Sequence, residues 1–153
     1  MTVNIKGHKI FIASPGGLET ERALFKNTIG DYNEIDAIHR GIHFFPVGWE
    51  YTLAGRGRPQ KLINDDIRQC DYFVLVLWDR WGSPPNPDGK GKYSSGTDEE
   101  YHFALDCIAD KNSPPCKIVV FFKAIDPRKL SDPGPQLTKV LVSGTRASVA
   151  AIM

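Results

Sequence analysis

One apolar run constrains the fold of this chain more than any other feature of its sequence. Residues 72–78, which read Tyr-Phe-Val-Leu-Val-Leu-Trp, follow Asp71 and are apolar at odd and even positions alike. Such a run is buried on both faces, which is typical of a central strand in a parallel sheet. Parallel strands need long crossover connections, so the chain is expected to alternate strands with helices.

The rest of the chain supplies this alternation. Further short strands are predicted at 9–13, 42–47 and 117–122, and Pro46 places the second of these near an edge because proline cannot donate to a ladder. Apolar residues at helical spacing predict helices over about 18–38, from about 59 to 70, and after residue 96. The order βαβαβαβ predicts an α/β fold, a flavodoxin-like three-layer sandwich with a parallel sheet in the order 2-1-3-4, without an evident fifth strand.

The two ends of the chain carry weaker patterns. Residues 1–8 are expected to be a loose lead-in, and a weak helical pattern covers about 137–142. The tail from 143 to 153 has no clear amphipathic pattern, so it is expected to be disordered or an artificial remnant. The predicted domain therefore spans residues 1–142.

Composition excludes several classes of function. The 19 basic and 18 acidic residues leave a net charge of +1, which argues against a nucleic-acid binder driven by bulk charge. No apolar run reaches membrane-spanning length and no signal-peptide core is present, so neither a membrane partner nor export is expected. Cys70, Cys107 and Cys116 are odd in number and lack zinc-site spacing, which favours reduced core cysteines in the cytoplasm.

Glu100 is the leading candidate for a functional residue. It begins a helical stripe that should face the core, while Asp98 and Glu99 should point elsewhere. The apolar members of that stripe are Phe103, Ala104, Cys107 and Ile108. Two interpretations remain open: Thr97 and Glu100 form a capping box at the helix start, or Glu100 is a catalyst beside the carboxyl end of the central strand.

The expected topology predicts where a ligand would bind. In open α/β sheets ligands bind outside the carboxyl ends of the strands where the strand order reverses, here between the first and third strands. The loops that meet there are 14–17 and 79–97, and Glu100 lies over the same crevice. The segment 14–17, Ser-Pro-Gly-Gly, precedes a helix and could bind phosphate, or it is simply a tight turn.

Several segments carry a family resemblance when they are taken in order. They are 10–17 with 19–22, 48–50, 59–60 with 62–64, 70–78, and 95–97 with Glu100. In this order they resemble the TIR-like group of nucleotide-processing domains, which is related to nucleoside 2-deoxyribosyltransferases. The nearest resemblance is to an uncharacterised TIR-like family found at the N-termini of larger signalling proteins with NTPase and repeat modules.

The resemblance implies an activity and a set of site residues. Gly96, Thr97 and Glu100 match the Gly-Thr-x-x-Glu of the deoxyribosyltransferases, whose glutamate attacks the sugar, and catalytic TIR domains use a helix-borne glutamate against NAD. The implied catalytic residue is Glu100, without a metal or cofactor and with NAD as substrate. Asp79 is the nearest match to an acidic residue that the relatives place after the third strand. The implied substrate-binding residues are Ser14, Pro15, Gly16, Trp49, Asp79, Trp81, Gly96 and Thr97.

The resemblance also implies signalling or defence by self-association, within a larger signalling protein. This chain departs from the family pattern in its long loop at 81–93, and it lacks the TIR Trp-Cys pair before the glutamate. Two other functions remain open: a non-catalytic interaction module and a nucleoside 2-deoxyribosyltransferase. Trp49 and Trp81 either stack on a base or pack as lids, and Arg56 and Arg58 either neutralise a pyrophosphate or are solvated.

Overall fold

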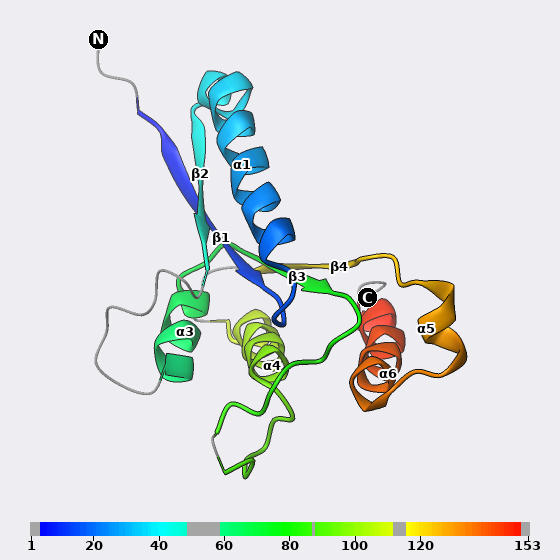
Figure 1. Cartoon of the computed structure of the whole chain (residues 1–153). Coiled ribbons are helices and arrows are strands. Elements are labelled where there is room, and N and C mark those ends of the chain that lie inside the picture. Colours follow the sequence, from blue (N-terminus) through cyan, green and yellow to red (C-terminus); the bar gives the residue numbers. More distant parts are fainter. Residues whose placement is uncertain (1–3, 49–58, 87, 112–115, 151–153) are drawn as a thin grey trace.

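The computed structural model describes residues 4–48, 59–86, 88–111 and 116–150 (Figure 1). Strands and helices alternate along the chain as predicted. They are β1 (Lys6–Ala13), α1 (Glu19–Ile35), the short 3-10 helix η1 (Ala37–Arg40), β2 (Ile42–Val47), α3 (Pro59–Arg68), β3 (Tyr72–Leu77), α4 (Gly96–Ala109), β4 (Lys117–Phe122), α5 (Pro127–Ser131) and α6 (Pro135–Ala150).

The four strands form one parallel sheet in the order β2-β1-β3-β4, which confirms the predicted order. The described residues add no fifth strand. Phe11 on β1 pairs with Phe73 on β3, and their stacked ring centroids lie 5.8 Å apart. Both rings are fully buried, as the apolar run of the central strand predicts.

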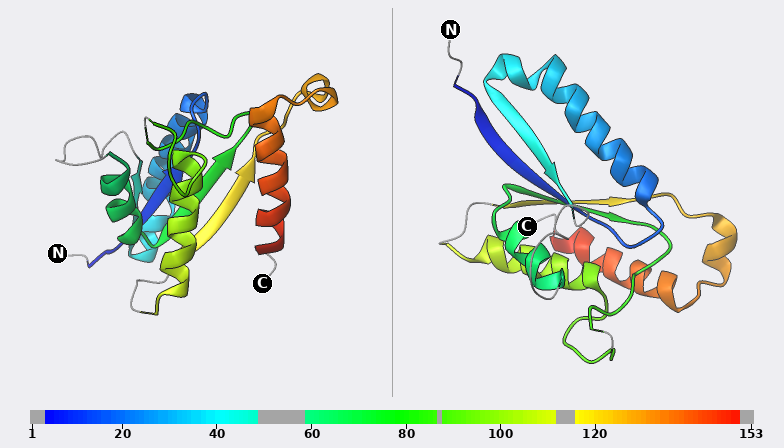
Figure 2. Two further views of the ribbon diagram at one scale, coloured as in Figure 1. Left: turned by 90° about the horizontal axis from the view of Figure 1, so that it is seen from below. Right: turned by 60° about the vertical axis from the view of Figure 1, so that its left-hand side comes forward.

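Helices cover the two faces of the sheet unequally (Figure 2). Helix α1 lies on one face, against β1 and β2, whereas α3, α4 and α6 lie on the other. The main core fills the second of these layers, because α3 contributes Ile63 and Ile67, α4 contributes Ala104, and α6 contributes Leu137 and Val140. This arrangement is a three-layer α/β fold.

The N-terminal strand is longer than the sequence predicted. β1 begins at Lys6 rather than residue 9, because Lys6 pairs with Ile42 of β2 and its amide donates to the Gly41 carbonyl at 2.8 Å. Asn33 fixes α1 to the same strand pair: its side-chain amide donates to the Phe44 carbonyl and accepts from the Phe44 amide, at 2.7 and 2.8 Å. The predicted helix over 18–38 is divided into α1 and η1, and Gly41 ends the latter in the left-handed region at a φ of 68°.

The C-terminal segment also differs from expectation. Helix α6 passes the predicted boundary at Val142 and ends at Ala150, so the tail is helical where disorder was expected. Burial of Leu137 and Val140 docks the first turns of the helix, and each further residue then adds a backbone hydrogen bond at little extra entropic cost.

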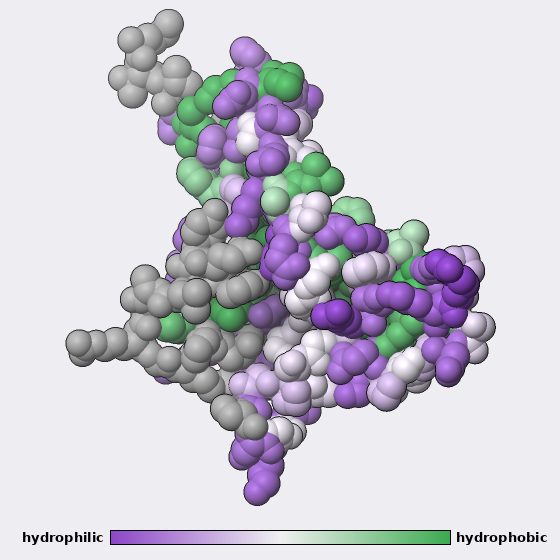
Figure 3. Space-filling view, viewed as in Figure 1, coloured by the Kyte–Doolittle hydropathy of each residue, from purple (hydrophilic) through white to green (hydrophobic). Residues whose placement is uncertain are grey.

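Polar residues dominate the surface around α5 and the loop between β3 and α4 (Figure 3).

Candidate functional site

A cavity of about 540 Å³ opens at the carboxyl ends of β1 and β3. Its walls come from the loop after β1, the start of α1, the loop after β3 and the start of α4. Six of the lining residues were predicted as site residues from the sequence: Ser14, Pro15, Gly16, Gly96, Thr97 and Glu100. The other four were not: Glu19, Arg22, Gly82 and Ser83. The predicted crevice is therefore present, and we call it the first cavity.

Gly82 shows how closely the two loops approach each other. Its φ is +100°, and a Cβ added there would lie 3.5 Å from the Cβ of Ser95 and 3.8 Å from that of Pro15. The amide of Gly96 donates to the Ser83 carbonyl at 3.0 Å, which ties the start of α4 to the same loop. The loops predicted to meet at the switch point do so.

Ser95, not Thr97, caps helix α4. The Ser95 backbone is extended, and its hydroxyl accepts from the Asp98 amide at 3.0 Å. The Asp98 carboxylate in turn accepts from the amide and hydroxyl of Ser94, both at 2.9 Å. Of the two interpretations left open for Thr97 and Glu100, the capping box is not supported, because the helix begins at Gly96 and the cap lies two residues earlier, at Ser95 with Asp98.

Two adjacent carboxylates of α4 are buried on different sides. Glu100 is 7% exposed and lines the first cavity. Glu99 is 6% exposed and accepts a hydrogen bond of 3.0 Å from the side-chain amide of Asn64 on α3. The sequence placed Glu99 away from the Glu100 stripe, but the periodicity gave no sign that α3 would bury it as well.

Arg22 is the main feature of the first cavity that sequence reasoning missed. It is 3% exposed, and its guanidinium donates to the Ser14 hydroxyl at 2.7 Å and to Glu19 Oε1 at 3.3 Å. Hydrogen bonds from the amides of Glu19 itself and Gly17, followed by the charge of Arg22, lower the pKa of the Glu19 carboxyl. The available signal was the Glu19–Arg22 spacing of three on one helix face. The guanidinium braces the loop after β1 and brings a buried positive charge to the wall of the cavity.

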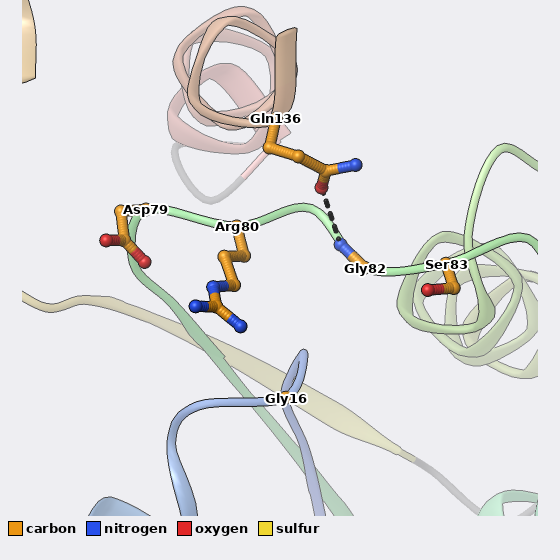
Figure 4. Close-up of a pocket in the computed structure, with 6 residues that line it drawn as sticks. All are labelled: Gly16, Asp79, Arg80, Gly82, Ser83 and Gln136. Carbon is orange, nitrogen blue, oxygen red and sulfur yellow. Dashed lines mark hydrogen bonds between the residues drawn. The ribbon is translucent and has the colours of Figure 1, made fainter. Parts of the chain in front are cut away.

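A second cavity of about 510 Å³ adjoins the first and shares Gly16, Gly82 and Ser83 with it. Its other lining residues are Asp79, Arg80 and Gln136 (Figure 4). The Gln136 side-chain oxygen accepts from the amides of Trp81 and Gly82, at 2.9 and 3.1 Å, so α6 holds the loop after β3 in place. Asp79, nominated for the catalytic crevice, lies in this second cavity and pairs with Lys129 of α5.

Two tryptophans, Trp49 and Trp81, were candidates for base stacking, and the structure describes only Trp81. Trp81 is 7% exposed and belongs to the core, and its indole nitrogen donates to the Ser94 hydroxyl at 2.7 Å. Of the two interpretations left open for Trp81, its burial in the core favours packing over base stacking. Trp49, Arg56 and Arg58 lie outside the described residues.

The comparisons with known proteins give a family without an activity. A family model described as "Domain of unknown function (DUF4062)" matches residues 9–130. This range includes every residue named in the two cavities except Gln136. No curated protein and no solved structure matches the chain significantly. Within the described part of the chain, no helix is long and apolar enough to cross a bilayer.

Proposed function

This chain belongs to the DUF4062 family, a domain of unknown function, and we propose that it cleaves the N-glycosidic bond of NAD. In this proposal a nucleotide binds at the carboxyl edge of the sheet, with its scissile ribose in the first cavity. Glu100 is the catalytic carboxylate. The resemblance to TIR-like domains supports the same activity.

The observation that carries the proposal is the position of Glu100. A carboxylate that is 7% exposed lies on the wall of a cavity of about 540 Å³, at the edge of the sheet where α/β folds bind ligands. The competing explanation for this residue, a helix cap, is met by Ser95 and Asp98 instead. The place of Glu100 on the cavity wall, and not a capping role, is thus what supports catalysis.

The chemistry needs one well-placed carboxylate. Cleavage of the bond between C1′ of the ribose and the nicotinamide nitrogen develops positive charge on the sugar. A carboxylate beneath C1′ stabilises that charge or bonds to the carbon, as in retaining glycosidases. Nicotinamide is cationic in NAD and takes the bonding electron pair, so it leaves as a neutral base without an added proton. Water then adds to C1′ and loses a proton, which gives ADP-ribose.

A self-association module is the second candidate function. Strand β4 is the last strand of the sheet among the described residues, and its Val119, Phe121 and Phe122 side chains are exposed. An apolar strand at a sheet edge is a ready surface for pairing with another chain. The two functions are compatible, because self-association could be required for catalysis. In that case the specific activity would rise with protein concentration.

Glu100→Gln tests the catalytic role, with Glu99→Gln as its matched control. Both variants remove a buried carboxylate from the same turn of α4, but only Glu100 lines the cavity. With NAD at micromolar protein concentrations and above, chromatography should show at least 100-fold less ADP-ribose from Glu100→Gln, whereas Glu99→Gln should retain activity in proportion to its folded fraction.

The proposal has clear contrary outcomes. Wild-type turnover by Glu100→Gln would remove Glu100 from the mechanism. Should that variant fail to fold, Glu100→Asp keeps the charge and withdraws it by one methylene, and it should still lower turnover strongly. A wild-type protein that cleaves neither NAD nor deoxynucleosides, even when self-associated, would leave the interaction module as the function.

A further inference from the structure

The two cavities lie side by side along the carboxyl edge of the sheet. They share Gly16, Gly82 and Ser83, so a ligand whose ribose lies against Glu100 has the second cavity next to it. Nothing lies within 4 Å of a Cβ added at Gly16. The wall between the cavities is therefore low, and ligand atoms can approach the backbone there.

Arg80 brings a positive charge to the second cavity. Its guanidinium carbon lies 3.9 Å from the position that a Cβ on Gly17 would take, and the side chain points across the cavity toward Gly16 (Figure 4). Within the described ranges, Arg80 makes no ion pair or hydrogen bond through its side chain. The one carboxylate that lines the same cavity, Asp79, pairs through Oδ2 with Lys129, and its Oδ1 is buried without a hydrogen-bond partner among the described residues.

The charges around the neighbouring wall are also paired. Glu19 lines the first cavity and accepts hydrogen bonds from Arg22 and from the Gly17 amide, so its charge is matched by that of Arg22. A guanidinium with five donors in a planar fork is the side chain best suited to a phosphate, which it binds through two parallel hydrogen bonds. Lys129 lies outside the lining of this cavity but pairs with Asp79, so Asp79, Lys129 and Arg80 together carry one negative and two positive charges.

We infer that the second cavity is an anion subsite for the phosphates of the substrate, with Arg80 as the binding residue. This inference rests on the proposed function, because it places the phosphates relative to a ribose held at Glu100. It defines the substrate class as nucleotides that carry a 5′-phosphate or pyrophosphate, and it excludes free nucleosides as the preferred substrate. A nucleoside deoxyribosyltransferase would have no use for this charge.

The test is a binding comparison that does not depend on catalysis. Calorimetry with ADP-ribose and with adenosine on the Glu100→Gln protein measures how much affinity the pyrophosphate and the terminal ribose add together, and the Arg80 variants then isolate the share that depends on the phosphate subsite. ADP-ribose should bind at least tenfold more tightly than adenosine. Adding Arg80→Gln should reduce that preference by about 10- to 100-fold, the range expected when a charge-assisted hydrogen bond is lost. Arg80→Lys should restore part of it, since lysine keeps the charge without the fork.

Arg40→Gln is the matched control. It removes the same charge from η1, where Arg40 pairs with Asp36, and η1 contributes no residue to either cavity. The ADP-ribose preference should be unchanged in this variant. An equal fall in both arginine variants would mean that net charge, not the cavity, attracts the ligand, which would overturn the inference.

The same measurements separate this inference from the catalytic proposal. Binding of ADP-ribose that depends on Arg80, together with absent NAD cleavage, would support the subsite and reject the proposed activity. NAD cleavage that depends on Glu100, with an ADP-ribose preference unaffected by Arg80→Gln, would reject the subsite alone. No binding of ADP-ribose up to millimolar concentration would also reject the subsite.

Discussion

Gly82→Ala offers a direct test of how the crevice is built. Gly82 lines both cavities and has a φ of +100°, a region that residues with a Cβ rarely adopt. Space is available, because the added Cβ would meet Ser95 and Pro15 at 3.5 and 3.8 Å, which are ordinary van der Waals contacts. Backbone strain therefore dominates the effect, and such strain costs about 1–3 kcal/mol per residue.

The expected loss is about 2 kcal/mol in the free energy of unfolding, which for a domain of this size lowers Tm by about 4–8 °C. Urea denaturation followed by circular dichroism measures it, and the midpoint should fall while the slope stays constant. NAD cleavage should also fall at temperatures where the variant is fully folded, because relief of the strain moves a wall that both cavities share.

Gly16→Ala is the matched control, since Gly16 lines the same two cavities. Its φ is not positive and nothing lies within 4 Å of its added Cβ. Replacing a glycine of this kind by alanine changes the free energy of unfolding by less than about 1 kcal/mol. Any increase in stability comes from a less flexible unfolded chain. Equal stability of wild type, Gly16→Ala and Gly82→Ala would refute the strained geometry of the loop after β3.

Two further predictions concern α4 and the core. Ser95→Ala should lower the free energy of unfolding by about 1 kcal/mol, because Ser95 provides the cap of α4. Thermal denaturation should show a larger loss for Ser95→Ala than for Thr97→Ala. The reverse order would support the capping box of Thr97 and Glu100. Burial raises the pKa of the Cys70 thiol to about 12, so iodoacetamide at pH 8 should not alkylate it in the native protein but should do so in urea. Because the unfolded thiol ionises near pH 9 and the folded one only near pH 12, the stability linked to Cys70 is complete below about pH 9 and is lost as the pH rises through this window. Native alkylation at the rate seen in urea would contradict the burial.

The topology could be predicted because it depends on patterns that extend over many residues. An apolar run at 72–78 can be buried on both faces only in the middle of a parallel sheet, and the alternation around it then leaves few possible orders. The strand order in turn placed the crevice, and Ser14, Gly96 and Glu100 were found in its wall.

The details that failed depend on contacts between distant segments. Ser95 and Thr97 both carry a hydroxyl at the start of a helical pattern, and the choice between them is made by the bond from the Gly96 amide to Ser83. Arg22 reads as a surface residue of an amphipathic helix, yet the loop that bears Ser14 covers it. No local pattern reveals that the Gln136 side-chain oxygen accepts a hydrogen bond from the backbone amide of Trp81.

The bond between Gln136 and the loop after β3 makes the first turn of α6 and the crevice parts of one linked equilibrium. Any ligand that favours the ordered loop must favour the docked helix by the same free energy, since such coupling is reciprocal. A contact made to α6 from outside can in turn strengthen or weaken ligand binding in the crevice without touching it. Gln136 lies beyond the residues 9–130 that match the family model, so the matched range contains the loop after β3 but not the side chain that bonds to it.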